Sequence, residues 1–205
     1  SITEHHKVIA DMGLAAINLI GVIIAIFIGI SLVNKEIERR TIYTIMARPI
    51  SRSFFIMGKY LGLALTLFVN MAFMLAVFLL TLWLYHVPIQ PSLFQASLLI
   101  FVEILVVTAI ALFFSTFTST TLSAIFTLGL YVIGHLTADL RALVSHSGSS
   151  PITSFVDLLY YLCPNLEMLN IKGQAAVGIV AAPEYVMMAS LYGLMYAGVL
   201  LIGAC

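Results

Sequence analysis

Apolar residues gather in five long runs along the chain, and polar segments separate these runs. The hydrocarbon core of a bilayer is about 30 Å thick, so a helix that crosses it needs roughly 20 apolar residues. The fourth run is short unless the hydroxyl-rich residues before it join the helix. The pattern predicts one transmembrane domain over residues 1–205, with spans at about residues 12–33, 60–85, 93–114, 122–138 and 185–205.

The composition supports this interpretation, since 62% of the residues are hydrophobic and only 9% are charged. Ordinary soluble domains have about 25% charged residues. The formal net charge is zero, so no basic excess indicates a nucleic-acid partner. We therefore predict an all-α integral membrane protein, a polytopic helical bundle in contact with membrane lipid.

The basic residues are distributed unevenly between the connections. The connection at residues 34–59 contains six of the nine Lys and Arg residues, whereas most acidic residues lie on the opposite side of the membrane. Short loops rich in Lys and Arg stay in the cytoplasm. The pattern therefore places residues 34–59 in the cytoplasm and the long connection 139–184 outside.

Two further connecting segments have local signatures. Residues 115–123 include seven hydroxyl residues, which is typical of a tight turn with helix caps. In the outer connection, Ser150 and Pro151 resemble a helix cap followed by a first-turn proline, and apolar residues follow at helical spacing up to Pro164. This pattern predicts an amphipathic helix that lies on the outer interface.

Residues 36–47 of the cytoplasmic connection have the spacing of a short helix with an apolar stripe. Pro49 ends this helix, because it pushes Arg48 out of the helical region. In one interpretation, the basic residues only fix the topology and bind anionic headgroups, at about 1 kcal/mol each. In another, the helix docks in a groove of a partner protein, since topology alone does not need the carboxylates of Glu36 and Glu38.

The stretch "KEIERRTIYTIMARPISRSFFIMGKYLGL" is similar to the signature region of ATP-binding-cassette (ABC) type-2 permeases, the membrane subunits of a large group of exporters. The stretch "YYLCPNLEMLNIKGQAAVG" resembles the segment before the last span in a prokaryotic subgroup of that family. One departure is Arg40, where the family commonly has glycine. The matching residues are Glu36, Glu38 and Thr41 in the first motif, Pro49, Ile50, Ser51 and Arg52 in a turn, and Gly58, Lys59, Gly62 and Leu63 at the start of the next span.

The resemblance implies six spans, so we expect the first span of the family to be missing from this chain. It also implies a prokaryotic plasma membrane and a second permease subunit, in a homodimer or a heterodimer. Each permease would rest its coupling helix on an ABC ATPase subunit, which would bind ATP and Mg²⁺ and drive export. The residues expected to contact the ATPase are Glu36, Glu38, Arg39, Arg40, Thr41, Ile42, Ile45, Met46, Arg48 and Pro49.

Few polar residues interrupt the spans. Glu103 lies mid-span, where a charge costs about 2.5–3.5 kcal/mol on insertion scales, so it is either a candidate pathway residue or a neutral acid bonded to a neighbouring helix. Asn70 is a weaker pathway candidate, like Asn18, because asparagines in membranes often tie helices together. His135 is predicted to lie at a different depth from Glu103 and to form no pair with it.

We predict no catalytic residues, no metal site and no cofactor bound by this chain. Gly58 and Lys59 do not form a nucleotide-binding loop, because the preceding glycine and the following Ser or Thr of that motif are missing. Two alternatives to a permease stay open. The chain could be a membrane anchor that recruits a cytoplasmic complex, or an intramembrane enzyme that uses Glu103 and His135, which is disfavoured because it needs two catalytic groups at one depth.

Overall fold

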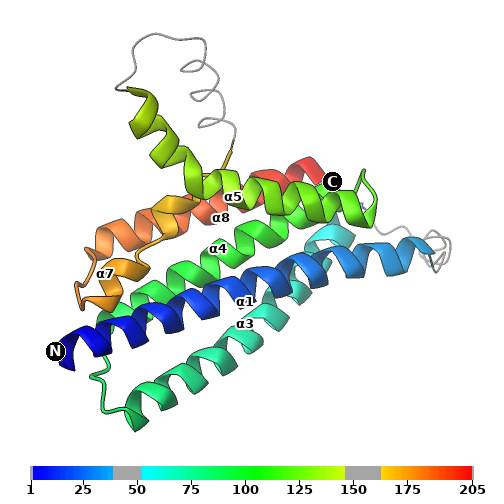
Figure 1. The fold of residues 1–205 in the computed structure, drawn as a ribbon. Helices are drawn as coiled ribbons and strands as arrows, with labels where there is room; N and C mark the ends of the chain where they lie inside the picture. The colour runs from blue at the N-terminus through cyan, green and yellow to red at the C-terminus, as the bar shows by residue number, and fades with distance from the viewer. Residues whose placement is uncertain (1, 39–51, 146–162, 205) are drawn as a thin grey trace.

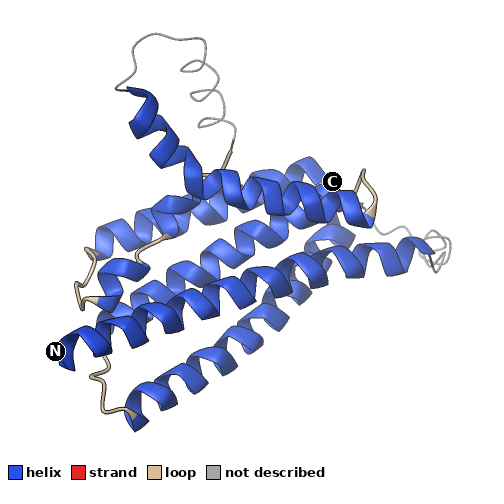
Figure 2. Cartoon of the chain, in the orientation of Figure 1, coloured by secondary structure: helices blue, strands red, loops and turns tan. Residues whose placement is uncertain are grey.

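The computed structural model describes residues 2–38, 52–145 and 163–204 (Figure 1). Its described residues form helices and connections and contain no strand (Figure 2). The predicted all-α fold of a polytopic membrane protein is confirmed. The helices are α1 (Ile2–Glu38), α3 (Arg52–Leu84), α4 (Pro91–Ser115), α5 (Thr120–Ser145), η1 (Leu166–Leu169), α7 (Lys172–Ala176) and α8 (Pro183–Ala204).

Among the residues that the structure describes, four helices are long and apolar enough to cross a membrane, over His6–Ile30, Phe54–Leu84, Pro91–Ser115 and Pro183–Ala204. The apolar part of α5, Thr120–Leu136, is shorter. The helix itself is longer than the predicted span 122–138, because hydroxyl residues join its start and polar residues extend its end.

Helix α4 lies at the centre of the bundle, where α1, α3, α5 and α8 contact it (Figure 1). Every residue from 102 to 112 is buried, as expected of a helix that is apolar on all sides. Helix α1 comes close to α4 because two of its glycines, Gly21 and Gly29, face Ile104 and Ala111. Small residues let helix backbones approach each other in this way.

The two ends of the bundle differ in the segments that they gather. The start of α1, the α3–α4 connection and α7 lie at one end, while the end of α1, the start of α3 and the α4–α5 turn lie at the other (Figure 1). The second end adjoins the basic connection 34–59, so it is the end predicted to be cytoplasmic.

The hydroxyl-rich turn at residues 116–119 closes the C-terminus of α4. Ser115, Thr116 and Thr118 donate to the carbonyls of Leu112, Phe113 and Phe114, at 2.8, 2.7 and 2.7 Å. Backbone amides of the turn also donate to the carbonyls of Phe113 and Phe114, so the hydroxyl groups add to these bonds where the chain leaves the helix. The hydroxyl groups thus cap the end of α4, and Thr118 also shares a hydrogen bond of 2.6 Å with the Ser123 hydroxyl in the first turn of α5.

Residues 163–182 of the predicted outer loop enter the bundle. Leu166 lies against Gly134 of α5, and Leu169 lies near Gly193 of α8, which in turn faces Val102. Both leucines are fully buried. The segment therefore reaches the depth of residue 102 on α4. The predicted amphipathic helix of the same loop, which ends before Pro164, lies outside the described residues.

Hydrogen bonds fix the rest of this segment to α4. Ser92 donates to the Ala175 carbonyl at 3.1 Å. Gln95 donates to the Ala181 carbonyl at 3.1 Å and accepts from the Ala181 amide at 3.0 Å. These bonds hold both sides of α7 against the first turns of α4.

Candidate functional site

Three polar side chains from three helices meet beside the middle of α4. Glu103 of α4 is 0% exposed, and Asn18 of α1 is 2% exposed. The Asn18 amide Nδ2 donates to both carboxylate oxygens of Glu103, at 3.3 and 3.2 Å. His135 of α5 places Nε2 3.3 Å from Oε1 of Glu103. We call these three residues the Glu103 cluster.

The neighbouring turn of α5 fixes the orientation of the His135 ring. Its Nδ1 atom lies 3.2 Å from the carbonyl oxygen of Tyr131, and the two rings are 4.7 Å apart. A carbonyl oxygen only accepts hydrogen bonds, so Nδ1 carries a hydrogen and donates it. In a neutral ring Nε2 is therefore the nitrogen without hydrogen, and it faces Glu103.

The prediction that Glu103 and His135 lie at different depths and form no pair is wrong. Its error lies in the end of the fourth span, because the apolar run stops at residue 138 whereas α5 continues to Ser145. Counted from the turn that α4 and α5 share, Glu103 lies about 12 residues from Ser115 and His135 about 15 residues from Thr120. At about 1.5 Å per residue the depths differ by only about 5 Å, which the two side chains bridge.

This pairing removes the depth argument against an intramembrane enzyme. The full burial of the Glu103 carboxylate is a different objection, since a substrate cannot touch it in this conformation. The second expectation for Glu103, an acid bonded to a neighbouring helix, agrees with its contact to Asn18.

Charged residues of the segment that enters the bundle lie within electrostatic range of the cluster. Lys172 of α7 and Glu167 of η1 are both close enough to affect Glu103 electrostatically. The Glu167 carboxylate accepts two hydrogen bonds from the side chain of Asn170, each 3.1 Å long. The Tyr131 hydroxyl also interacts with Glu103. The cluster thus lies within electrostatic range of the segment that enters the bundle.

The structure brings Asn18, and not Asn70, to Glu103. Asn70 instead lines a small cavity between α1, α3 and α4, of about 10 Å³, which is about the size of one water molecule. The other residues that line it are Ile17, Gly21, Leu67, Met71, Met74 and Ile104. Sequence reasoning noticed Asn18, Glu103 and His135 singly, but their spacing gives no signal that pairs them.

The predicted coupling residues lie at or beyond the end of α1. Glu36 and Glu38 belong to its last turn. The other predicted contacts lie outside the described residues: Arg39, Arg40, Thr41, Ile42, Ile45, Met46, Arg48 and Pro49.

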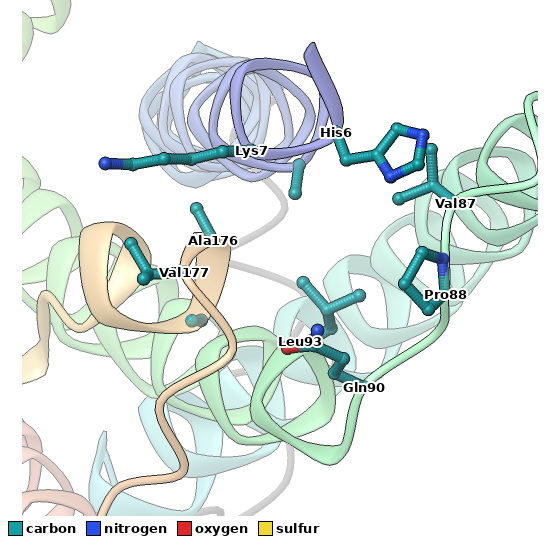
Figure 3. Close-up of a pocket in the computed structure, with 10 residues that line it drawn as sticks. His6, Lys7, Val87, Pro88, Gln90, Leu93, Ala176 and Val177 are labelled. Carbon is teal, nitrogen blue, oxygen red and sulfur yellow. The ribbon is translucent and has the colours of Figure 1, made fainter. Parts of the chain in front are cut away.

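A larger pocket of about 340 Å³ opens at the end of the bundle predicted to be outside, between the start of α1, the α3–α4 connection and α7. His6 and Lys7 are its basic lining residues, and Gln90 adds an amide. Figure 3 shows that His6 and Lys7 leave α1 in different directions, so they do not converge on one point. The pocket therefore lacks the convergent polar groups of a binding site.

Comparison with known families gives a match that covers nearly the whole chain. A family model described as "ABC-2 family transporter protein" matches residues 2–199. A search of curated proteins and a search of solved structures found no match. The matched range contains all three residues of the Glu103 cluster and both carboxylates at the end of α1.

Proposed function

Since the chain belongs to the ABC-2 family of transporter proteins, and so is a membrane permease of an ABC transporter, we propose that it is an exporter subunit. Its substrate would leave a prokaryotic cell across the plasma membrane. The energy would come from ATP hydrolysis on a partner ABC ATPase, which would hold both ATP and Mg²⁺. This chain would supply the transmembrane path and the contact through which force enters.

The observation that carries this proposal is the continuity of α1. The helix runs without interruption from Ile2 to Glu38, and the basic coupling segment follows it directly. It contains no proline, so no break separates its cytoplasmic end from its contact with α4. A displacement of the coupling segment by the ATPase would therefore move the whole helix.

The charges of the coupling segment suit a protein partner better than lipid alone. Glu36 and Glu38 would pair with bases of the ATPase, while Arg39 and Arg40 would pair with acids. Ile42, Ile45 and Met46 would fill a groove. Removing one partner of a desolvated charge pair costs about 2–5 kcal/mol of association.

A second permease would complete the transporter. Helices α3 and α8 expose large apolar side chains that this chain does not cover, and in a membrane these contact lipid or another subunit. Examples are Phe68 and Phe73 on α3 and Met187, Met195 and Ile202 on α8. Glu103 and Asn70 are proposed to border the substrate path once the helices move apart.

The test is a charge reversal at the end of α1. We expect Glu38→Lys to weaken the complex with the ATPase at least about 30-fold, which corresponds to about 2 kcal/mol. In proteoliposomes that contain the ATPase, ATP hydrolysis should continue without transport. The matched control is Glu184→Lys, which reverses a carboxylate in the first turn of α8 at the outer end. Normal coupled transport by Glu38→Lys, with normal membrane insertion, would refute the docking role.

A further inference from the structure

The geometry around Glu103 and His135 limits the number of protons that the two side chains can hold. His135 Nδ1 carries a hydrogen because it faces the Tyr131 carbonyl at 3.2 Å. Nε2 of His135 and the carboxylate of Glu103 lie 3.3 Å apart, and Nε2 is buried and makes no hydrogen bond with a described residue as placed, so these two groups are the positions at which the pair can take up a proton. The pair can therefore hold none, one or two protons between these two groups.

Burial selects the state with one proton. With no proton, a carboxylate with 0% exposure would face the lone pair of a neutral imidazole. With two protons, an imidazolium would face a neutral acid and leave a net positive charge inside the span. With one proton the pair is neutral as a whole, either as acid and imidazole or as carboxylate and imidazolium. Buried charges are costly unless they are paired or neutralised.

We propose that Asn18, Glu103 and His135 form an intramembrane proton-binding site, in which one proton shared by Glu103 and His135 holds α5 against the α1–α4 pair. The proton binds as Glu103 carboxylate and neutral His135 take up one H⁺, and no other bond changes. Separation of α5 from α4 breaks the pair and leaves a carboxylate and an imidazole that bind protons independently. This site goes beyond the proposed ATP coupling and does not depend on it.

The elements around α4 bring opposing charges to this site. Lys172 of α7 brings a positive charge within electrostatic range of Glu103, and Glu167 of η1 brings a negative charge. Helix α5 adds the hydroxyl of Tyr131. The two formal charges from this segment have opposite signs and partly offset each other, so they do not neutralise the Glu103 carboxylate in place of the shared proton.

The remaining neighbours contribute no charge among the described residues. Helix α3 presents the Tyr60 hydroxyl, which already donates to the Leu105 carbonyl at 3.2 Å. Helix α8 presents small buried residues, namely Ala189, Gly193 and Ala197.

The side-chain amide of Asn18 can hydrogen-bond to Glu103 in either of its protonation states. As placed, its Nδ2 donates to both carboxylate oxygens, while its Oδ1 is buried and has no partner in the described part of the chain. A half turn of the amide would bring Oδ1 to the carboxyl group, where it could accept the hydrogen of a protonated acid. The unused acceptor is what a site with an exchangeable proton requires.

The two partners differ in their exposure. The side chain of His135 is 21% exposed, whereas that of Glu103 is 0% exposed. The Nε2 atom of His135 is itself buried, so the proton of the pair is shielded from the surroundings in this conformation.

The first experiment measures the thermal unfolding midpoint in lipid nanodiscs between about pH 5 and pH 10, a range that contains the ordinary His titration. We expect the midpoint of the unaltered chain to fall by several degrees as rising pH removes the shared proton. Glu103→Gln should abolish this fall, because its amide is neutral at every pH. The control Glu184→Gln, an exposed carboxylate at the outer end, should retain it. Equal pH profiles for the unaltered chain and Glu103→Gln would overturn the proposal.

A second measurement keeps the proposal testable if Glu103→Gln does not fold. The chain has five histidines, so replacing the other four by Gln leaves His135 as the single imidazole. Nitrogen NMR of this otherwise unaltered site should show Nδ1 protonated throughout, and Nε2 should change in the pH interval in which the midpoint falls. An Nδ1 without hydrogen, or an Nε2 signal that does not change over this interval, would contradict the shared proton. The four replaced residues are His5, His6, His86 and His146.

Discussion

The contact between α4 and α8 provides a sharp test of the packing around the Glu103 cluster. A Cβ atom on Gly193 would lie 2.5 Å from Cγ1 of Val102, whereas carbon atoms in contact are about 3.5–4.0 Å apart. Gly193→Ala must therefore separate the helices by about 1 Å or distort Val102, which is buried and β-branched. Overpacking of this kind costs about 1–3 kcal/mol.

The matched control is Gly198→Ala on the same helix, where a new Cβ would meet nothing within 4 Å. Both substitutions gain the same helix propensity, about 1 kcal/mol, so the difference between them isolates the clash. At about 2–4 °C per kcal/mol for a chain of this size, Gly193→Ala should melt about 2–12 °C below Gly198→Ala in nanodiscs. Equal melting temperatures would refute the close α4–α8 contact.

A double-mutant cycle identifies the atom responsible. Val102→Ala removes Cγ1, so Gly193→Ala should cost less in that background than in the unaltered chain. If Val102→Ala gives no relief, then the clash that we assign to Val102 is wrong, even when Gly193→Ala alone is destabilising.

Two further predictions concern the outer segment. Gly178 has a φ of +83°, and a Cβ atom added there would overlap the side chain of Gln90, so Gly178→Ala should destabilise the chain by at least about 1 kcal/mol. The control Gly173→Ala, which has open space around its Cβ, should not destabilise it. Equal melting temperatures of the two variants would contradict this prediction. Burial raises the pKa of the Cys163 thiol, so in a chain with Cys205→Ser, maleimide labelling of the native protein should be slower than that of the unfolded protein at the same pH and should rise at higher pH. Because the buried thiol disfavours deprotonation, its contribution to stability is present below about pH 8.5 and is lost as the pH rises above it. Equal maleimide labelling rates of the native and the unfolded protein would contradict the burial of the thiol.

The sequence predicts the helices of this protein well because the bilayer sets simple requirements for them. Runs of apolar residues of the length of a membrane span leave little choice but a helix, since every backbone group must be satisfied within the segment. Each predicted span accordingly overlaps a described helix. The ends are less predictable, as Ser145 of α5 shows, because polar residues extend a helix beyond the apolar core without changing the apolar pattern.

Contacts between helices are not predictable from the same pattern. Whether Glu103 meets His135 depends on the relative depth of α4 and α5, and a few residues at the end of a helix change that depth by several ångströms. The entry of Leu166 and Leu169 into the bundle depends on glycines of two other helices, at residues 134 and 193. Single-segment periodicity contains no information about such complementary surfaces.

The contacts of α1 show where motion from the coupling segment would be passed on and where it would be released. Asn18, Gly21 and Gly29 fix α1 to α4 at three heights, so sliding by one turn, about 5.4 Å, would break all three contacts together. Helices α1 and α4 should therefore move as one body. Helix α5 contacts that body through His135, and in the proposed site one proton decides whether the contact is neutral. Among these contacts within the span, protonation can change the strength of the contact between α5 and the α1–α4 pair. Helix α5 is therefore the helix most suited to move during a transport cycle.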